Sequence, residues 1–165
     1  MRDYYRSDAK LSEDGRYRWL LRREWEPTSA ATRVTFIMLN PSTADAEIDD
    51  PTIRRCVGYA NRWGFQGLYV VNLFGLRATN PQALYKEADP IGRENDDEIM
   101  SAVVNANLVV CAWGNHGRLM NRGDYLARVM TRLHPLHVLD IGLTGQPKHP
   151  LYLRGDLEPT PWIIA

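Results

Sequence analysis

Cysteine is scarce in this sequence of 165 residues, which contains only Cys56 and Cys111. Both lie in apolar surroundings, so we expect core residues rather than a disulfide, and two cysteines cannot hold a four-cysteine cluster. No apolar stretch is long enough to span a membrane, and the start, MRDYYRSDAK, lacks the apolar segment of a signal peptide. We therefore expect a cytoplasmic protein with no membrane partner.

The sequence has no excess of charge of either sign, because 20 basic residues balance 20 acidic ones. A protein that holds duplex nucleic acid tightly usually shows a clear basic face, so this balance argues against strong nonspecific DNA binding. The sequence also has no glycine-rich phosphate loop, no nucleophile elbow and no pair of histidines at metal-binding spacing. These absences argue against several common classes of hydrolase.

The hydrophobic content of 44% is enough for one globular domain with a substantial core. Short apolar runs predict four buried strands, and capped or amphipathic segments between them predict helices. The strands are 34–39, 68–71, 108–112 and 137–141, and the helices are 51–63, 80–85, 90–105 and 125–133. This alternation predicts a three-layer α/β/α fold around a central, mainly parallel four-stranded sheet.

The predicted core, residues 34–153, follows an N-terminal strand extension, 1–33, and precedes a C-terminal tail, 154–165. In the extension, the alternation of Tyr17, Trp19 and Leu21 predicts a half-buried antiparallel strand with its arginines on the solvent-exposed face. This strand is expected either to form a hairpin with the strand at 34–39 or to lie at an edge of the sheet.

Polar or turn-forming residues follow all four predicted parallel strands. They are Asn40-Pro41-Ser42, Asn72, Trp113-Gly114-Asn115 and, after the fourth strand, the loop with Lys148-His149-Pro150. The C-terminal ends of parallel strands meet at one edge of the sheet, where open α/β sheets bind ligands. We therefore expect a binding site at this edge. Two alternatives remain: these residues merely terminate strands, and His149 is a structural residue of a surface loop.

Four acidic residues, Asp45, Glu47, Asp49 and Asp50, follow the first strand end. Their oxygen atoms are of the kind that divalent cations prefer in phosphate chemistry. A solvated loop in which Asp49 or Asp50 caps a helix beginning at Pro51 explains them as well. The metal hypothesis requires at least two of the three aspartates to converge.

Several runs occur in one order between about Val34 and Leu153, namely MLNPSTADAEIDDPTIRR, VVNLFGLRATNP, DPIGREND, AWGNHG and GQPKHPLYL. They resemble a bacterial and phage family of unknown function, the domain of unknown function 1643 family. More distantly, the strand-end motifs are similar in order to those of the uracil-DNA glycosylase superfamily. There, Asp or Asn before Pro positions the attacking water, a later Asn reads the base, Trp-Gly ends a further strand, and a His-Pro loop carries a leucine wedge nearby.

The glycosylase resemblance implies a uracil-DNA glycosylase-like fold and hydrolysis of the N-glycosidic bond of a nucleobase in DNA or a nucleotide. Asn40, where the most active relatives have Asp, would hold the water, and His149 would hydrogen-bond the base oxygen on which charge develops. Asn72 would read the base, and Leu151 or Tyr152 would fill the gap left by a flipped base. Further substrate-binding residues are expected to be Pro41, Ser42, Arg77, Trp113, Gly114 and Lys148. No cofactor and no metal is implied.

Two other functions remain open. The alternative is a noncatalytic module that binds a nucleotide or nucleic acid in a retained pocket, and the third is metal-dependent phosphate chemistry. A basic, aromatic-lined groove beside the pocket would favour polymeric DNA as partner, whereas a closed pocket ringed by Arg77 and Lys148 would favour a small phosphorylated ligand. The sequence gives no oligomeric state.

Overall fold

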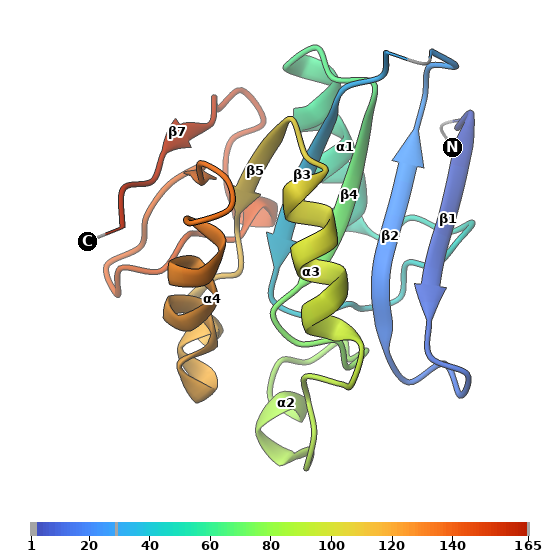
Figure 1. The fold of residues 1–165 in the computed structure, drawn as a ribbon. Coiled ribbons are helices and arrows are strands. Elements are labelled where there is room, and N and C mark those ends of the chain that lie inside the picture. The colour runs from blue at the N-terminus through green and yellow to red at the C-terminus, as the bar shows by residue number, and fades with distance from the viewer. Residues whose placement is uncertain (1–2, 29, 165) are drawn as a thin grey trace.

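A seven-stranded mixed sheet forms the centre of the computed structural model, which describes residues 3–28 and 30–164 (Figure 1). Across the sheet the order is β1 (Arg6–Leu11), β2 (Arg18–Glu24), β4 (Gly67–Asn72), β3 (Arg33–Met38), β5 (Leu108–Cys111), β6 (His137–Val138) and β7 (Thr160–Pro161). The four strands β4, β3, β5 and β6 are parallel, and β1, β2 and β7 join antiparallel. The predicted mixed α/β class is confirmed, but the sheet has two more strands than predicted.

The edges of the sheet account for these errors. β1 is a largely polar strand and β7 is only two residues long, with Pro161 at its end, so neither shows an apolar strand pattern. The fourth parallel strand, predicted for 137–141, is limited to His137–Val138. β2 is neither the edge of the sheet nor the hairpin partner of β3, because it pairs with β1 on one side and with β4 on the other.

Helix α1 (Pro51–Arg62) follows the prediction closely. The side chain of Asp50 accepts a hydrogen bond from the Ile53 amide, Pro51 occupies the first turn, and Gly64 follows the helix with φ of 85°. The remaining helices are α2 (Ala83–Lys86), α3 (Asn95–Val104) and α4 (Arg122–Met130).

Helix α3 begins five residues later than the predicted start at residue 90, because the preceding segment forms a turn. The side chain of Asp89 accepts a hydrogen bond from the Gly92 amide, and Gly92 has φ of 88°. Helix α4 begins three residues earlier than predicted, directly after two left-handed residues, Met120 and Asn121.

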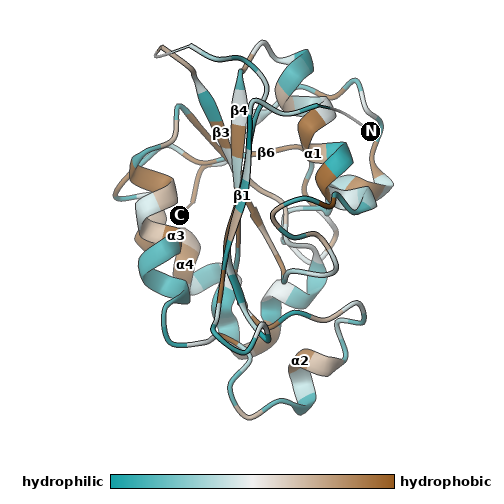
Figure 2. Cartoon of the chain, turned by 90° about the vertical axis from the view of Figure 1, so that its right-hand side faces the viewer, coloured by the Kyte–Doolittle hydropathy of each residue, from teal (hydrophilic) through white to brown (hydrophobic). Residues whose placement is uncertain are grey.

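The two faces of the sheet carry separate cores (Figure 2). α1 packs on one face with apolar residues of β3 and β4, and α3 and α4 pack on the other. Within each strand the side chains alternate between the two cores, so that Phe36 faces α1 and Ile37 faces α3. This alternation decides to which face each strand-end residue points.

Both cysteines are buried and free, which confirms that they are core residues. Burial raises the pKa of the Cys56 and Cys111 thiols well above the usual range, because a thiolate in either core would lose its hydration. No helix in the described part of the chain is long and apolar enough to cross a membrane.

Candidate functional site

Three of the predicted site residues follow neighbouring strands at one edge of the sheet. Asn72 ends β4, Asn40 lies two residues after β3, and Gly114 follows β5. Met38 and Asn72 are paired in the parallel ladder, and Met38 belongs to the core beneath α1. The Asn72 side chain therefore points to the α1 face, and the two-residue period of β3 directs Asn40 to the same face.

Asn72 is the most unusual of these residues because its buried amide has no partner. The residue is 1% exposed, and neither Nδ2 nor Oδ1 has a hydrogen-bond partner among the described residues. Its backbone is well held, since its carbonyl accepts a hydrogen bond of 2.9 Å from Nδ2 of Asn95. Buried polar side chains are nearly always hydrogen-bonded, so an amide left free at both ends is a rare arrangement.

The Asn40 amide has a fixed orientation. Its Nδ2 donates to the carbonyls of Pro41, at 3.1 Å, and Ala78, at 2.8 Å. The Ala78 amide in turn donates to the Pro41 carbonyl at 2.9 Å, which joins the loops that follow β3 and β4. Because both bonds use the amino group, the Oδ1 atom is left to accept a hydrogen bond from a ligand or a water molecule.

His149 lies beside the end of β5. A Cβ atom on Gly114 would be 3.7 Å from Cβ of His149, and Gly114 has φ of 76°, a conformation that favours glycine. Nδ1 of His149 accepts a hydrogen bond of 3.2 Å from the Leu151 amide, so the proton of the neutral ring is on Nε2. Burial lowers the pKa of His149, and the nearby charge of Asp50 opposes this effect. The imidazole is therefore a neutral donor at pH 7.

Asp50 connects this edge to the loop before α1. Its Oδ1 accepts the Ile53 amide at 2.9 Å and its Oδ2 accepts the Ala44 amide at 3.4 Å. The carboxylate is 8% exposed and influences the pKa values of both His149 and Arg18. Asp50 is thus a helix cap and, at the same time, the buried negative charge of the site.

Two arginines of β2 correct the expectation that the arginines of this strand face solvent. Arg18 is 2% exposed and Arg23 is 0% exposed. Arg23 makes an ion pair of 2.9 Å with Asp49. Arg18 donates from Nη1 to the carbonyl of Ala44 at 2.9 Å, and its Nε is buried without a partner.

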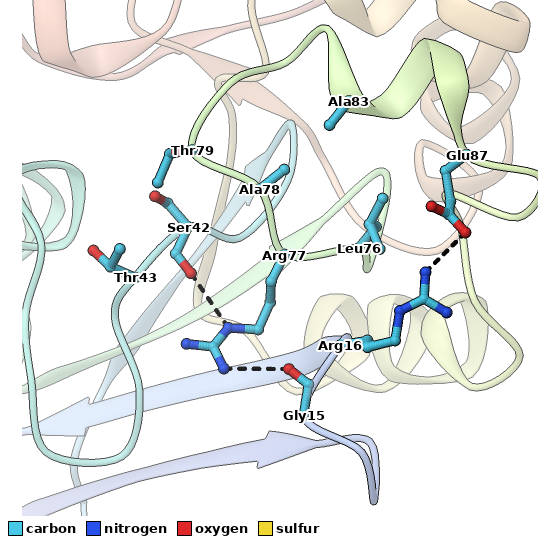
Figure 3. Close-up of a pocket in the computed structure, with 10 residues that line it drawn as sticks. All are labelled: Gly15, Arg16, Ser42, Thr43, Leu76, Arg77, Ala78, Thr79, Ala83 and Glu87. Atoms are coloured by element: carbon cyan, nitrogen blue, oxygen red, sulfur yellow. Dashed lines mark hydrogen bonds and ion pairs between the residues drawn. The ribbon is translucent and has the colours of Figure 1, made fainter.

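An open cavity of about 610 Å³ lies beside the strand ends (Figure 3). Its ten lining residues are Gly15, Arg16, Ser42, Thr43, Leu76, Arg77, Ala78, Thr79, Ala83 and Glu87. The Arg77 guanidinium is anchored to the carbonyls of Ser42 and Gly15, each at 3.3 Å, and Arg16 pairs with Glu87. Only Ser42 and Arg77 belong to the predicted set, so this cavity adjoins Asn40 and is lined by neither Asn72 nor His149.

Other predicted residues are not brought to the α1 face. Trp113 is 1% exposed in the core beneath α3 and α4, where its indole donates to Gln146 Oε1 at 2.7 Å. Lys148 is exposed and paired with Asp140 at 2.8 Å, and it does not line the cavity of Arg77. The pocket ringed by Arg77 and Lys148 is therefore not formed.

The 3₁₀ segment Pro150–Tyr152 follows His149 directly. Leu151 is half-buried in this segment, whereas Tyr152 is 86% exposed. The backbone of the segment is anchored from α1, since Nε of Arg55 donates to the Pro150 carbonyl at 3.3 Å. Of the two residues predicted to fill a gap in DNA, Tyr152 is thus the one that protrudes.

The acidic loop after β3 is held by its own structural contacts. Asp45 accepts the amides of Glu47, at 2.9 Å, and Ile48, at 2.8 Å, and these bonds lower its pKa. Asp49 pairs with Arg23, and Asp50 caps α1. Among the described residues, no three His, Cys, Asp or Glu side chains gather in a way that could hold a metal ion. All three aspartates instead bind groups of the chain itself.

Comparison with known proteins identifies the family of the chain. No protein of curated function and no solved structure matches this sequence. A family model described as a protein of unknown function, DUF1643, matches residues 18–151. The match begins at Arg18 and ends at Leu151, so it includes Asn40, Asn72 and His149 but not Tyr152. The chain therefore belongs to the DUF1643 family.

Proposed function

We propose that this protein is a glycosylase-like hydrolase that cleaves the N-glycosidic bond of a nucleobase in DNA or a nucleotide, on a fold of the uracil-DNA glycosylase type. The observation that carries the proposal is the buried Asn72 amide, which is unpartnered at both ends. Leaving such a group unsatisfied costs about 1–3 kcal/mol, and no contact among the described residues offsets this cost. A ligand with a matching donor and acceptor would offset it.

The edge of a nucleobase supplies this match. An amide carries an acceptor oxygen beside a donor nitrogen, and the O=C–N–H edge of an oxo-base carries the complementary pair. Two hydrogen bonds in a dry pocket also discriminate strongly against bases that lack either group. Asn72 would thus choose the base.

Asn40 would position the attacking water through its Oδ1 atom. Its amino group is held by the carbonyls of Pro41 and Ala78, which fixes the direction of the oxygen. An amide can hold water but cannot take up its proton, so it contributes less than a carboxylate would. This remains sufficient when the transition state already has oxocarbenium character at the sugar, although we expect slow turnover.

His149 would donate its Nε2 proton to a carbonyl oxygen of the departing base. Its lowered pKa keeps the ring neutral, and its bond from the Leu151 amide fixes the tautomer that has the proton on Nε2. A fixed donor at the atom where negative charge develops stabilises the transition state more than the ground state. Tyr152, 86% exposed on the same segment, would replace a flipped base in the stack.

Release of free base tests the proposal directly. Single- and double-stranded oligonucleotides carrying uracil, hypoxanthine, xanthine or modified pyrimidines are incubated with the wild type and with Asn40→Ala, Asn72→Ala and His149→Ala. We expect release of one oxo-base, slowed about 100-fold or more in Asn72→Ala and His149→Ala. Nucleotides carrying the same bases form a second panel, which separates the two substrate classes.

Asn105 and His134 provide matched controls. Both belong to the opposite edge of the sheet, where Asn105 donates to the Ser101 carbonyl at 2.8 Å and Nε2 of His134 contacts the Ala106 carbonyl at 3.0 Å. Asn105→Ala and His134→Ala should leave base release unchanged. Base binding without release would instead support the noncatalytic module, and neither binding nor release from any substrate would refute both functions.

A further inference from the structure

Arg18 is a buried cation that forms no direct ion pair with a described residue, although the charge of the buried Asp50 carboxylate partly offsets the lowering of its pKa by burial. Its residue is 2% exposed, it forms no ion pair with any described residue, and its Nε has no hydrogen-bond partner. The guanidinium donates one hydrogen bond to the described residues, from Nη1 to the Ala44 carbonyl at 2.9 Å. Burial lowers its pKa to about 10, so the guanidinium is still charged at neutral pH. A buried charge is normally paired in direct contact, whereas Arg18 has no described carboxylate in contact and keeps an Nε–H that no described group accepts.

A β-bulge turns Arg18 into the protein. In the ladder between β1 and β2, Lys10 pairs with Leu20 and Leu11 pairs with Arg18, so Trp19 is the extra residue. Leu20 packs on the core beneath α3 and Leu21 on the core beneath α1. Without the bulge Arg18 would share the face of Leu20. Because Trp19 is the extra residue, the side chain of Arg18 points to the α1 face instead. Bulges commonly redirect side chains in this way next to active sites.

Arg18 thereby lies at the same edge of the sheet as Asn72. β2 and β4 are antiparallel neighbours, and Leu21 pairs with Val70. The start of β2, where Arg18 lies, is therefore beside the end of β4, where Asn72 lies. The Arg18 amide donates to the Gly75 carbonyl just beyond β4, at 3.0 Å. Along the strand ends of the α1 face the order is Arg18, Asn72, Asn40 and then His149 beside Gly114, with adjacent strands about 4.8 Å apart.

Three of the five buried side-chain atoms without a partner in the described structure belong to Arg18 and Asn72. They are two kinds of donor, Nε and Nδ2, and one acceptor, Oδ1. Neither residue bonds to the other, although both are buried. The two side chains thus offer an outside ligand a charged donor, a neutral donor and an acceptor on adjacent strands.

We propose that Arg18 is a further residue of the base site, a fixed cation that holds a carbonyl oxygen of the base while the base departs as an anion. This inference rests on the proposed function for the identity of the ligand. During cleavage the bond from C1′ to nitrogen breaks, and its electron pair moves to the base and onto the carbonyl oxygens. The water oxygen bonds to C1′, and the proton that the water loses neutralises the base. Arg18 has only donors, so the site takes oxo-bases and rejects a base that presents an amino group there.

Arg23 shows what a purely structural arginine looks like on this strand. It is 0% exposed, two strand positions beyond Leu21 on the same face. Its guanidinium pairs with Asp49 and also donates to the carbonyls of Asp45 and Ile48. Arg23 is therefore neutralised within the protein, and its replacement serves as the matched control for a buried arginine.

Binding of free bases at constant pH tests the inference without any need for cleavage. Calorimetry at pH 8 compares 5-nitrouracil, an anion, with uracil, which is neutral. We expect the wild type to prefer the anion at least 10-fold, Arg18→Gln to lose this preference, and Arg23→Gln to keep it. The same preference in Arg18→Gln, equal binding of both bases by the wild type, or no binding of either base would overturn the inference. If Arg18→Gln does not fold, Arg18→Met, which also removes the charge, replaces it, and an unchanged preference there also overturns the inference.

Cleavage rates then separate this inference from the proposed function. In a series of pyrimidine substrates, Arg18→Gln should slow release about 100-fold, and the loss should grow as the departing base becomes less acidic. A role confined to holding the Ala44 loop predicts the same loss for every base and would refute the inference. If the wild type releases no base but its preference for the anion depends on Arg18, the proposed hydrolysis fails and the anion site stands.

Discussion

Replacing Asn72 by leucine is expected to stabilise the folded protein while it abolishes base binding. Most polar side chains in a core are held by partners, and their removal destabilises the fold. The Asn72 amide contributes no side-chain hydrogen bond to the described structure, although it is 1% exposed. Leucine has a similar branched shape and needs no partner. The gain in the free energy of unfolding would therefore measure how much the unpartnered Asn72 amide destabilises the wild type.

The expected size follows from the burial of the amide. An unsatisfied buried polar group costs about 1–3 kcal/mol, and the slightly larger leucine returns part of this as packing strain of less than about 1.5 kcal/mol. We expect a net stabilisation of about 1–2 kcal/mol. For a chain of this length that corresponds to a rise in Tm of about 2–8 °C.

Asn95 is the matched control, because it is also an asparagine that is fully buried, at 0% exposed. Its Nδ2 donates to the carbonyls of Asn72, at 2.9 Å, and Leu73, at 3.1 Å. Asn95→Leu removes both bonds, each worth about 0.5–1.5 kcal/mol, and we expect a net loss of stability of about 1–2 kcal/mol. The two substitutions are chemically identical but should shift stability in opposite directions.

Urea unfolding followed by circular dichroism measures both effects, and calorimetry with the released base measures binding. The reasoning is refuted if Asn72→Leu destabilises the protein as much as Asn95→Leu does. That result would mean that the Asn72 amide has a partner in solution, such as an internal water molecule, and is not free for a ligand.

Three further outcomes follow from the buried polar and ionisable groups. Arg23→Gln removes the ion pair of Asp49 and leaves it, among the described residues, only the hydrogen bond from the Tyr4 hydroxyl, so urea unfolding should show a loss of about 3 kcal/mol. The folded-state pKa of His149 lies below its unfolded value of about 6.5, so the unfolded chain binds the proton first, and stability should fall as pH falls below about 6.5. His149→Gln should reduce the difference between urea midpoints at pH 7.5 and pH 5.5, and an unchanged difference would contradict the direction of that pKa shift. Cys56 and Cys111 should not react with a thiol reagent until the protein unfolds, because burial raises both thiol pKa values; rapid reaction under native conditions would show that either core opens readily.

The centre of the fold could be predicted from the sequence because buried parallel strands are nearly continuous apolar runs. Residues 34–39, 68–71 and 108–112 are such runs, and each overlaps a central strand. β1 and β7 could not be predicted in this way, since their ladders depend on backbone pairing and their side chains are largely exposed or half-buried. An edge strand is determined by the strand beside it rather than by its own apolar pattern.

The position of the strand-end residues could be predicted, but the face to which each one points could not. Asn72 and Trp113 both follow buried strands, yet Asn72 points toward α1 and Trp113 toward α3 and α4. The two-residue period assigns a face only once the strand register is known, and the sequence does not supply that register. For the same reason the sequence does not show that the Asn72 amide lacks a partner, because its possible partners come from other strands.

Arg18 illustrates how a single irregularity reverses a prediction from periodicity. The alternation of Tyr17, Trp19 and Leu21 indicates one apolar face, but the bulge at Trp19 changes the parity of the strand at that point. Arg18 and Arg23 are both inside the protein, and only Arg23 forms a direct ion pair with the acidic loop. The Asp50 charge acts on Arg18 without direct contact, so among the described residues the guanidinium bonds only to the Ala44 carbonyl and its Nε stays without a partner. Under the proposed function, a base that enters at this edge of the sheet would satisfy the free Nε of Arg18 together with the vacant amide of Asn72.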